Sequence, residues 1–142
     1  MSKTMIERKP TRGMRNNNPL NIRHGKSRWV GMAEQQTDKA FVQFTARKYG
    51  YRAAFVLIRN YIQRFRANTI GKIVARWAPS ADGNNTLAYV NYVSHTTGIP
   101  ADYPLRFEDQ EAIVAVVRSM AQIESGLIER TEVLNEAYVM SL

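Results

Sequence analysis

The chain has 142 residues, of which 44% are hydrophobic, 23% are charged and none is cysteine, a composition ordinary for one soluble globular domain. It excludes disulfide bonds, thiolate metal sites and cysteine nucleophiles, and no apolar run is long enough to cross a bilayer. Residues 1–76 carry seventeen Lys and Arg against three acids, a net +14, whereas residues 77–142 carry −6. So uneven a field favours a polyanionic partner such as nucleic acid or an anionic bacterial envelope, although a solvated basic face accounts for the charge as well.

The N-terminal part of the chain shows no helical periodicity. Residues 1–11 are polar and basic, without the apolar core of a secretory signal peptide, and they predict a flexible tail ahead of a single domain at residues 12–142. Residues 12–28 are rich in Asn and Gly, which favour turns. The segments Trp29–Met32 and Phe41–Phe44 indicate two short strands, and the polar stretch between them predicts a β-hairpin.

From residue 49 onward, apolar residues recur every three or four positions, which predicts a series of amphipathic helices. Their boundaries are marked by the N-cap candidates Thr69, Asn85 and Thr86 and by the stop signals Pro79 and Gly98. The expected helices cover residues 49–66, 70–78, 86–98, 107–125 and 131–140. We expect the first and the fourth of them to pack against each other around Phe55, Ile58, Val117 and Met120.

Glu124 stands out because it lies at the end of the most apolar predicted helix. At helical spacing it shares one face with Val117, Met120, Ala121 and Ile128. A carboxyl group buried on that face would have a raised pKa, and a carboxylic acid that is still protonated near neutrality can act as the general acid in glycosidic bond cleavage. Alternatively, the helix has already ended and Glu124 is a solvated residue beside Gly126. Glu129 is expected to lie outside this face.

Three segments carry further motifs. They are Asn17–Arg23 followed by Trp29-Val30-Gly31 and Phe41–Phe44, then Arg76–Pro79 followed by Thr86–Tyr89, and finally Ala121–Leu127 with its Ile-Glu-Ser-Gly core. Together they resemble the lysozyme-like peptidoglycan enzymes, especially glucosaminidases and lytic transglycosylases, and the run Arg-Gly-Met-Arg-Asn-Asn-Asn-Pro is similar to the opening of small phage cell-wall-degrading proteins. In most of these families the Glu-Ser-Gly helix comes before the Asn-rich hairpin. This chain would therefore be a circular permutation of them.

The resemblance implies a lysozyme-like α+β fold, mostly α-helical, with a cleft between a β-tongue and a helical lobe. It also implies that Glu124 is the general acid of a muramidase, glucosaminidase or lytic transglycosylase, with Tyr89 lining the cleft nearby. Glu34 and Asp38 lie in the predicted hairpin, where each is a candidate second carboxylate or simply a solvated turn residue. If neither serves, the acetamido or 6-hydroxyl group of the substrate would complete the reaction, which favours a lytic transglycosylase.

Other side chains have two interpretations each. Asn17, Asn18 and Asn21 could hydrogen-bond the N-acetyl groups of a glycan or only build the turn. Trp29 and Tyr89 could contact sugar or pack in the core. The single His24 and His95 have no ligand partner at metal spacing, and we expect neither a metal nor another cofactor.

The sequence leaves other functions open. A cell-wall endopeptidase or amidase on the same fold is one alternative, and a basic nucleic-acid-binding or virion structural module is another. For the muralytic enzyme we expect a monomer without a membrane span whose partner is the glycan strand of peptidoglycan. It would act at the cell wall or in the periplasm, and a holin, a secretion system or a virion would deliver it, because no signal peptide is apparent.

Overall fold

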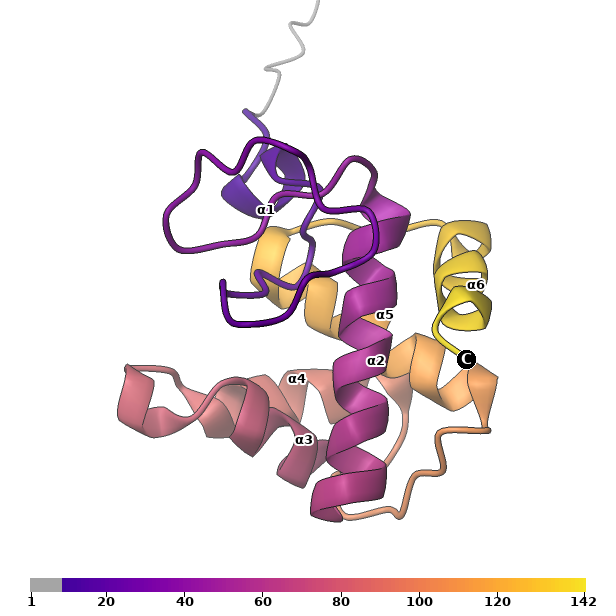
Figure 1. Ribbon diagram of the computed structural model, residues 1–142. Coiled ribbons are helices and arrows are strands. Elements are labelled where there is room, and N and C mark those ends of the chain that lie inside the picture. Colours follow the sequence, from indigo (N-terminus) through magenta and orange to yellow (C-terminus); the bar gives the residue numbers. More distant parts are fainter. Residues whose placement is uncertain (1–8) are drawn as a thin grey trace, which may run out of the picture.

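A computed structural model describes residues 9–142, and these residues are mainly α-helical (Figure 1). The elements are α1 (Arg12–Arg15), α2 (Arg47–Phe65), α3 (Ile70–Trp77), the 3₁₀ turn η1 (Ser80–Asp82), α4 (Thr86–Thr97), α5 (Gln110–Ser125) and α6 (Thr131–Met140). Residues 16–46, which we call the loop lobe, lie between α1 and α2 and form no helix. Among residues 9–142 no helix has both the length and the hydrophobicity needed to span a membrane.

Most helix boundaries follow from local capping. Thr69, Asn85 and Asp109 accept hydrogen bonds from backbone N–H groups in the first turns of α3, α4 and α5. Gly98 and Gly126 end α4 and α5 in the left-handed conformation, with φ of 73° and 69°. The predicted helices at 70–78, 86–98 and 131–140 are confirmed to within a residue. α2 begins two residues earlier than predicted, and α5 begins at Gln110 because the Asp109 side chain caps it there.

The loop lobe does not support the predicted β-hairpin. Within the described residues only two isolated antiparallel bridges occur, Arg23 with Phe41 and Met32 with Phe44. The segment Trp29–Met32 is a turn rather than a strand, since Gly31 has a φ of 79° and the Met32 N–H donates to the Trp29 carbonyl. Residues 12–15 of the predicted loop also form the short helix α1, capped by Thr11.

Polar side chains hold the loop lobe together in place of a strand ladder. The buried Asn18 amide donates to the carbonyls of Ile22 and Val42 at 2.9 and 2.8 Å, and its oxygen accepts from the Ile22 N–H. Gln43 accepts a hydrogen bond from the Thr37 N–H, and its own N–H donates to Gln36. Such side-chain-to-backbone bonds satisfy the chain without a sheet. The tail predicted at residues 1–11 lies for its first eight residues outside the described part of the chain.

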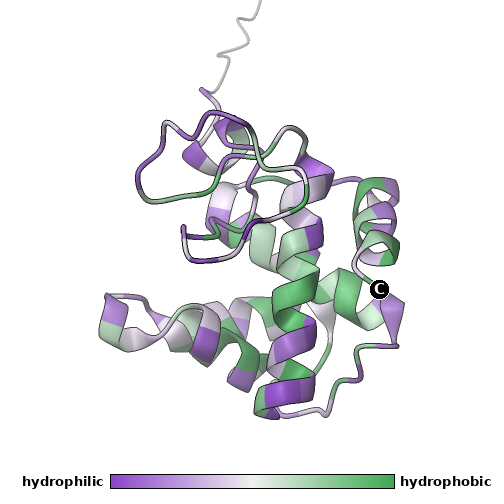
Figure 2. Cartoon of the chain, viewed as in Figure 1, coloured by the Kyte–Doolittle hydropathy of each residue, from purple (hydrophilic) through white to green (hydrophobic). Residues whose placement is uncertain are grey.

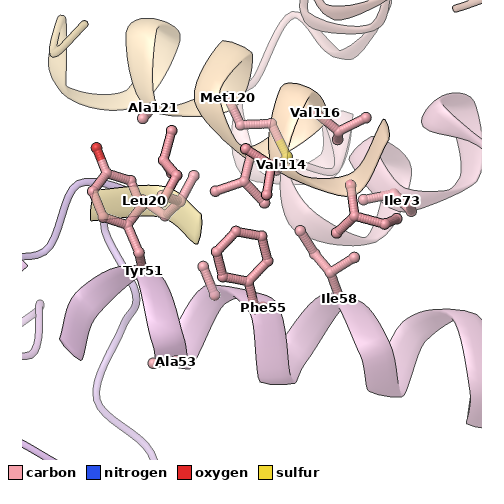
Figure 3. Close-up of a cluster of buried hydrophobic side chains, with 14 of the residues drawn as sticks. Leu20, Tyr51, Ala53, Phe55, Ile58, Ile73, Val114, Val116, Met120 and Ala121 are labelled. Atoms are coloured by element: carbon pink, nitrogen blue, oxygen red, sulfur yellow. The ribbon is translucent and has the colours of Figure 1, made fainter. Parts of the chain in front are cut away.

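The hydrophobic core lies where α2 packs on α5 and α6. Helix α2 runs through the middle of the molecule, and its central turns are hydrophobic whereas its C-terminal turns are polar (Figures 1 and 2). The four residues predicted to form this contact, Phe55, Ile58, Val117 and Met120, are completely buried. Phe55 and Ile58 point from α2 towards Met120 on α5 (Figure 3). The rings of Phe55 and of Tyr138 on α6 pack edge to face, with their centroids 5.6 Å apart.

Phe55→Ala is therefore expected to lower the free energy of unfolding by about 3–5 kcal/mol, because the cavity left in a closely packed core is only partly refilled. Urea denaturation followed by circular dichroism would measure the loss. Phe65→Ala on the same helix is the matched control, since this ring is 54% exposed, and its expected cost is below about 1 kcal/mol. Equal costs for the two variants would contradict the described core.

Candidate active site

A cleft of about 530 Å³ separates the loop lobe from the helices. Its walls come from the loop lobe, from the middle of α2, from the end of α3 with η1, and from Glu124 in the last turn of α5. Four aromatic residues line it: Trp29, Phe41, Tyr61 and Trp77. Its polar lining includes Asn21, Arg23, Asp82, Asn84 and Glu124. Aromatic walls with a few polar groups are typical of a binding site for an extended polar ligand.

The carboxyl group of Glu124 is half-buried and held by two side chains from distant elements. The hydroxyl of Tyr89, on α4, donates to Oε2 at 3.0 Å. The amide of Asn21, in the loop lobe, donates to Oε1 at 3.3 Å and to the main-chain carbonyl of Glu124 at 2.9 Å. Both donors fix the orientation of the carboxyl group. Tyr89 thus lies beside Glu124 as the resemblance implies, but it is buried and does not line the cleft, so its hydroxyl contacts Glu124 and not the cleft.

The surroundings of Glu124 favour the protonated form. Burial raises the pKa of Glu124, and although the hydrogen bonds from Tyr89 and Asn21 and the charge of Arg23 act in the opposite direction, the net shift is upward. The last turn of a helix carries partial negative charge, which also disfavours a second negative charge there. Burial raises the pKa of the Tyr89 hydroxyl as well, so it remains a donor. A proton can therefore stay on Glu124 at a higher pH than on an exposed glutamate.

The loop lobe docks directly on the last turn of α5. The Ser125 hydroxyl donates to the Pro19 carbonyl at 2.9 Å, and the Thr11 hydroxyl donates to the Ser125 carbonyl at 2.7 Å. Gly13 lies so close that a Cβ there would be 2.7 Å from the Cβ of Ser125. Asn21 adopts a left-handed conformation, with φ of 53°, where its amide reaches Glu124. These contacts explain why the Glu-Ser-Gly motif and the Asn-rich motif meet in space.

The predicted glycan-binding residues have different positions. Trp29 lines the cleft and is available to a ligand. Asn17 donates to the Phe44 carbonyl and Asn18 is fully buried, and neither lines the cleft, so both amides build the loop lobe. Asn21 lines the cleft, but its amide is bound to Glu124. Its amide therefore helps to fix the orientation of the Glu124 side chain.

The structure does not bring Glu34 or Asp38 into the cleft. Asp38 accepts two hydrogen bonds from Arg12, both of 2.7 Å, and further ones from Asn16 and from backbone N–H groups, and these hold its pKa well below the usual range. Glu34 is exposed and does not line the cleft. Besides Glu124, the carboxylate that lines the cleft is Asp82, an exposed residue of η1. Sequence analysis missed it because only the fold brings η1 opposite the loop lobe.

The helical spacing wrongly predicted the positions of Ile128 and Glu129, which follow Glu124 in the chain. Because α5 ends at Ser125, Ile128 is off the helix and is 78% exposed. Glu129 is only 5% exposed and accepts hydrogen bonds from Arg47 at 2.7 and 3.3 Å and from the Arg130 N–H. Although burial opposes its ionisation, these partners lower the pKa of Glu129. Glu129 therefore fastens the segment after α5 to the start of α2, and a substitution there is expected to affect stability.

Tyr89→Phe should raise the pKa of Glu124 further, because the hydroxyl that favours the carboxylate is lost while burial remains. Carbon-13 NMR titration of glutamate-labelled protein measures this directly, with Glu124→Gln identifying the signal. An unchanged or lower Glu124 pKa in Tyr89→Phe would show that the hydrogen bond does not form in solution. Tyr103→Phe is the matched control, since that side chain is 56% exposed.

Glu129→Gln should destabilise the protein by about 1–3 kcal/mol, since the buried Glu129 side chain loses its charge-assisted hydrogen bonds to the half-exposed Arg47. The Glu129 pKa is lowered by folding, so its contribution is present above the pKa of an unfolded glutamate, about 4.3, and is lost as the pH falls. The difference between the two proteins in urea denaturation should therefore shrink in acid. A pH-independent difference would rule out the ion pair as its origin.

No family model matches the chain. Among curated proteins, the chain is similar to Protein P5 of Pseudoalteromonas phage PM2, with 38% identity over 118 residues. The matched region covers 81% of this chain and 71% of that protein.

In the described residues, no three His, Cys, Asp or Glu side chains are grouped so that they could hold a metal ion.

Proposed function

The chain belongs to the family of Protein P5 of Pseudoalteromonas phage PM2, and from the geometry of the cleft we propose that it cleaves the glycan strands of peptidoglycan with Glu124 as the general acid. The observation that carries the proposal is the Glu124 carboxyl group, half-buried with a raised pKa in the wall of an aromatic cleft. A phage has to pass the bacterial cell wall, so such an activity suits a protein of a phage family. The same proposal includes a permuted lysozyme-like fold, with the loop lobe in the place of the β-tongue.

In the proposed reaction, Glu124 donates its proton to the glycosidic oxygen as the bond between that oxygen and C1 breaks. The departing sugar leaves as an alcohol, and positive charge develops on the ring that keeps C1. Tyr89 and Asn21 then stabilise the carboxylate of Glu124, because both donate to it. Trp29, Tyr61 and Trp77 offer flat apolar faces on which the sugar rings can stack.

The second half of the reaction is proposed to use the substrate itself, because neither Glu34 nor Asp38 lines the cleft. The 6-hydroxyl oxygen of the glycosyl unit bonds to C1 and gives its proton to the Glu124 carboxylate, which restores the acid and forms an anhydro-sugar. Hydrolysis assisted by the acetamido group would give a reducing end in its place. Asp82 is the carboxylate in the cleft that could replace either route by activating water.

Glu124→Gln should keep the fold and lose about 10²–10⁴-fold in the rate of glycan cleavage, because Gln is nearly isosteric but cannot donate the proton. Since folding raises the Glu124 pKa, the ionised group destabilises the protein as the pH rises, and the variant should be equally or more stable near neutrality. Digestion of purified peptidoglycan followed by mass analysis of the fragments measures the rate and names the product. Anhydro-sugars are expected.

Two further variants sharpen this test. Glu111→Gln, at the exposed start of the same helix, is the matched control and should retain full activity. Asp82→Asn should retain most activity if the substrate completes the reaction. If the variant instead loses as much activity as Glu124→Gln, and the unaltered protein releases reducing ends, the second step is assigned to Asp82. Full activity of Glu124→Gln would remove the proposed function, and free amines among the products would replace it with an endopeptidase or amidase.

The basic half of the chain suggests that charge brings the protein to an anionic envelope. Lysis of whole cells should then weaken with added salt more than cleavage of short soluble glycans, because salt screens charges beyond about 8 Å at physiological ionic strength. Turbidity and fragment assays at matched salt measure both. Equal responses would show that the charge is only a solvated surface, and tight, strongly salt-dependent binding of nucleic acid without glycan cleavage would favour the nucleic-acid-binding alternative.

A further inference from the structure

We propose that Arg23 is a binding site for a carboxylate carried by the glycan, so that the cleft selects an anionic glycan over a neutral one. This inference rests on the proposed function and adds the chemistry of the substrate to it. Arg23 is exposed and lines the same cleft as Glu124. Beside aromatic rings and neutral polar groups, the lining holds the carboxyl residues Asp82 and Glu124, and Arg23 adds a positive charge to it.

The backbone fixes Arg23 firmly in this wall. Its neighbours pair with the strand-like residues opposite, since the Val42 N–H donates to the Ile22 carbonyl and the His24 N–H to the Ala40 carbonyl. Arg23 and Phe41 therefore form the pair between these bonds, in which opposite side chains stand closest together. The guanidinium carbon accordingly lies 5.0 Å from the centre of the Phe41 ring. Stacking on an aromatic ring pre-orients a guanidinium and leaves its edge N–H groups for another partner.

A second arginine beside the same ring shows the contrast. Arg12 lies 4.5 Å from the centre of the Phe41 ring, but its charge is neutralised by two hydrogen bonds to Asp38. Among the described residues, Arg23 has no carboxylate within salt-bridge distance. Its charge also acts on Glu124, where it opposes part of the rise in pKa that burial causes. The positive charge of Arg23 therefore stands in the cleft without an ion-pair partner among the described residues.

The chemistry of peptidoglycan supplies a partner. Its glycan carries carboxylates, either on the lactyl group of muramic acid where the peptide is absent or on the peptide itself. A planar guanidinium binds a carboxylate through two parallel hydrogen bonds. Asp82 on η1 lies in the facing wall and would repel the same group. The two charges together orient the glycan, with its anionic substituents towards the loop lobe and its neutral edge towards η1.

The test uses binding, so that it does not depend on turnover. In the inactive Glu124→Gln background, calorimetry would compare three tetrasaccharides: peptidoglycan units with peptides, the same units with free lactyl groups, and neutral chitotetraose. Arg23→Gln should weaken binding of a carboxylate-bearing ligand by about 10- to 100-fold, the usual effect of losing a charge-assisted bond, and leave chitotetraose unaffected. The ligand that responds identifies the carboxylate. Lys26→Gln, an exposed cation of the same loop that does not line the cleft, is the control for net charge.

The outcomes separate this inference from the proposed function. Equal losses for charged and neutral ligands, or no loss, would overturn the carboxylate site while cleavage by the unaltered protein still supported the proposed function. Losses of the same size in Lys26→Gln would assign the effect to general attraction and overturn it too. If the unaltered protein neither binds nor cleaves any of the glycans, both fall together.

Discussion

The capping of helix α5 by the loop lobe is the interaction on which the rest of the site depends. The last carbonyl groups of a helix have no partner within the helix and must find donors elsewhere. Here Asn21 donates to the carbonyl of Glu124, and Thr11 donates to that of Ser125. The loop lobe and the start of α1 are thereby fixed across the end of α5, and the space between the loop lobe and α2, α3 and η1 is the cleft. The contact that ends the helix therefore also places the acid.

Much of the helical framework is predictable from sequence because its signals are local. Thr69 and Asn85 cap within three residues, and Gly98 and Gly126 stop helices by their own conformational freedom. The loop lobe is different, because Asn18 donates to the Val42 carbonyl and Asp38 pairs with Arg12, and no periodic pattern connects these residues. Alternating apolar residues there suggest strands. Once side chains satisfy the backbone, however, no strand ladder is needed.

The site shows the same division. Glu124 could be identified because a carboxylate on an apolar helix face is unusual, and Tyr89 followed from the resemblance. The neighbours that only the tertiary fold reveals were not foreseen: the Asn21 amide donates to Glu124, Asp38 pairs with Arg12, and Asp82 lines the cleft from the turn η1. Chain order has no bearing on this geometry, since the Glu-Ser-Gly and Asn-rich segments meet although Pro19 and Ser125 are 106 positions apart in the sequence.

The proposed activity poses an electrostatic problem, because it requires a proton to stay on Glu124 in a protein whose N-terminal half carries +14. Cations near an acid lower its pKa, so an unpaired cluster of arginines would remove the proton. In the described residues Asp38 pairs with Arg12 and Glu129 pairs with Arg47, and Arg23 is the cation whose charge acts to lower the pKa of Glu124. Burial of Glu124 then outweighs the remaining influence of Arg23. Asp38, a candidate second carboxylate, and Glu129, expected to lie outside the apolar helix face, thus each pair with an arginine of the basic half. The carboxyl group of Glu124 in the cleft keeps a raised pKa.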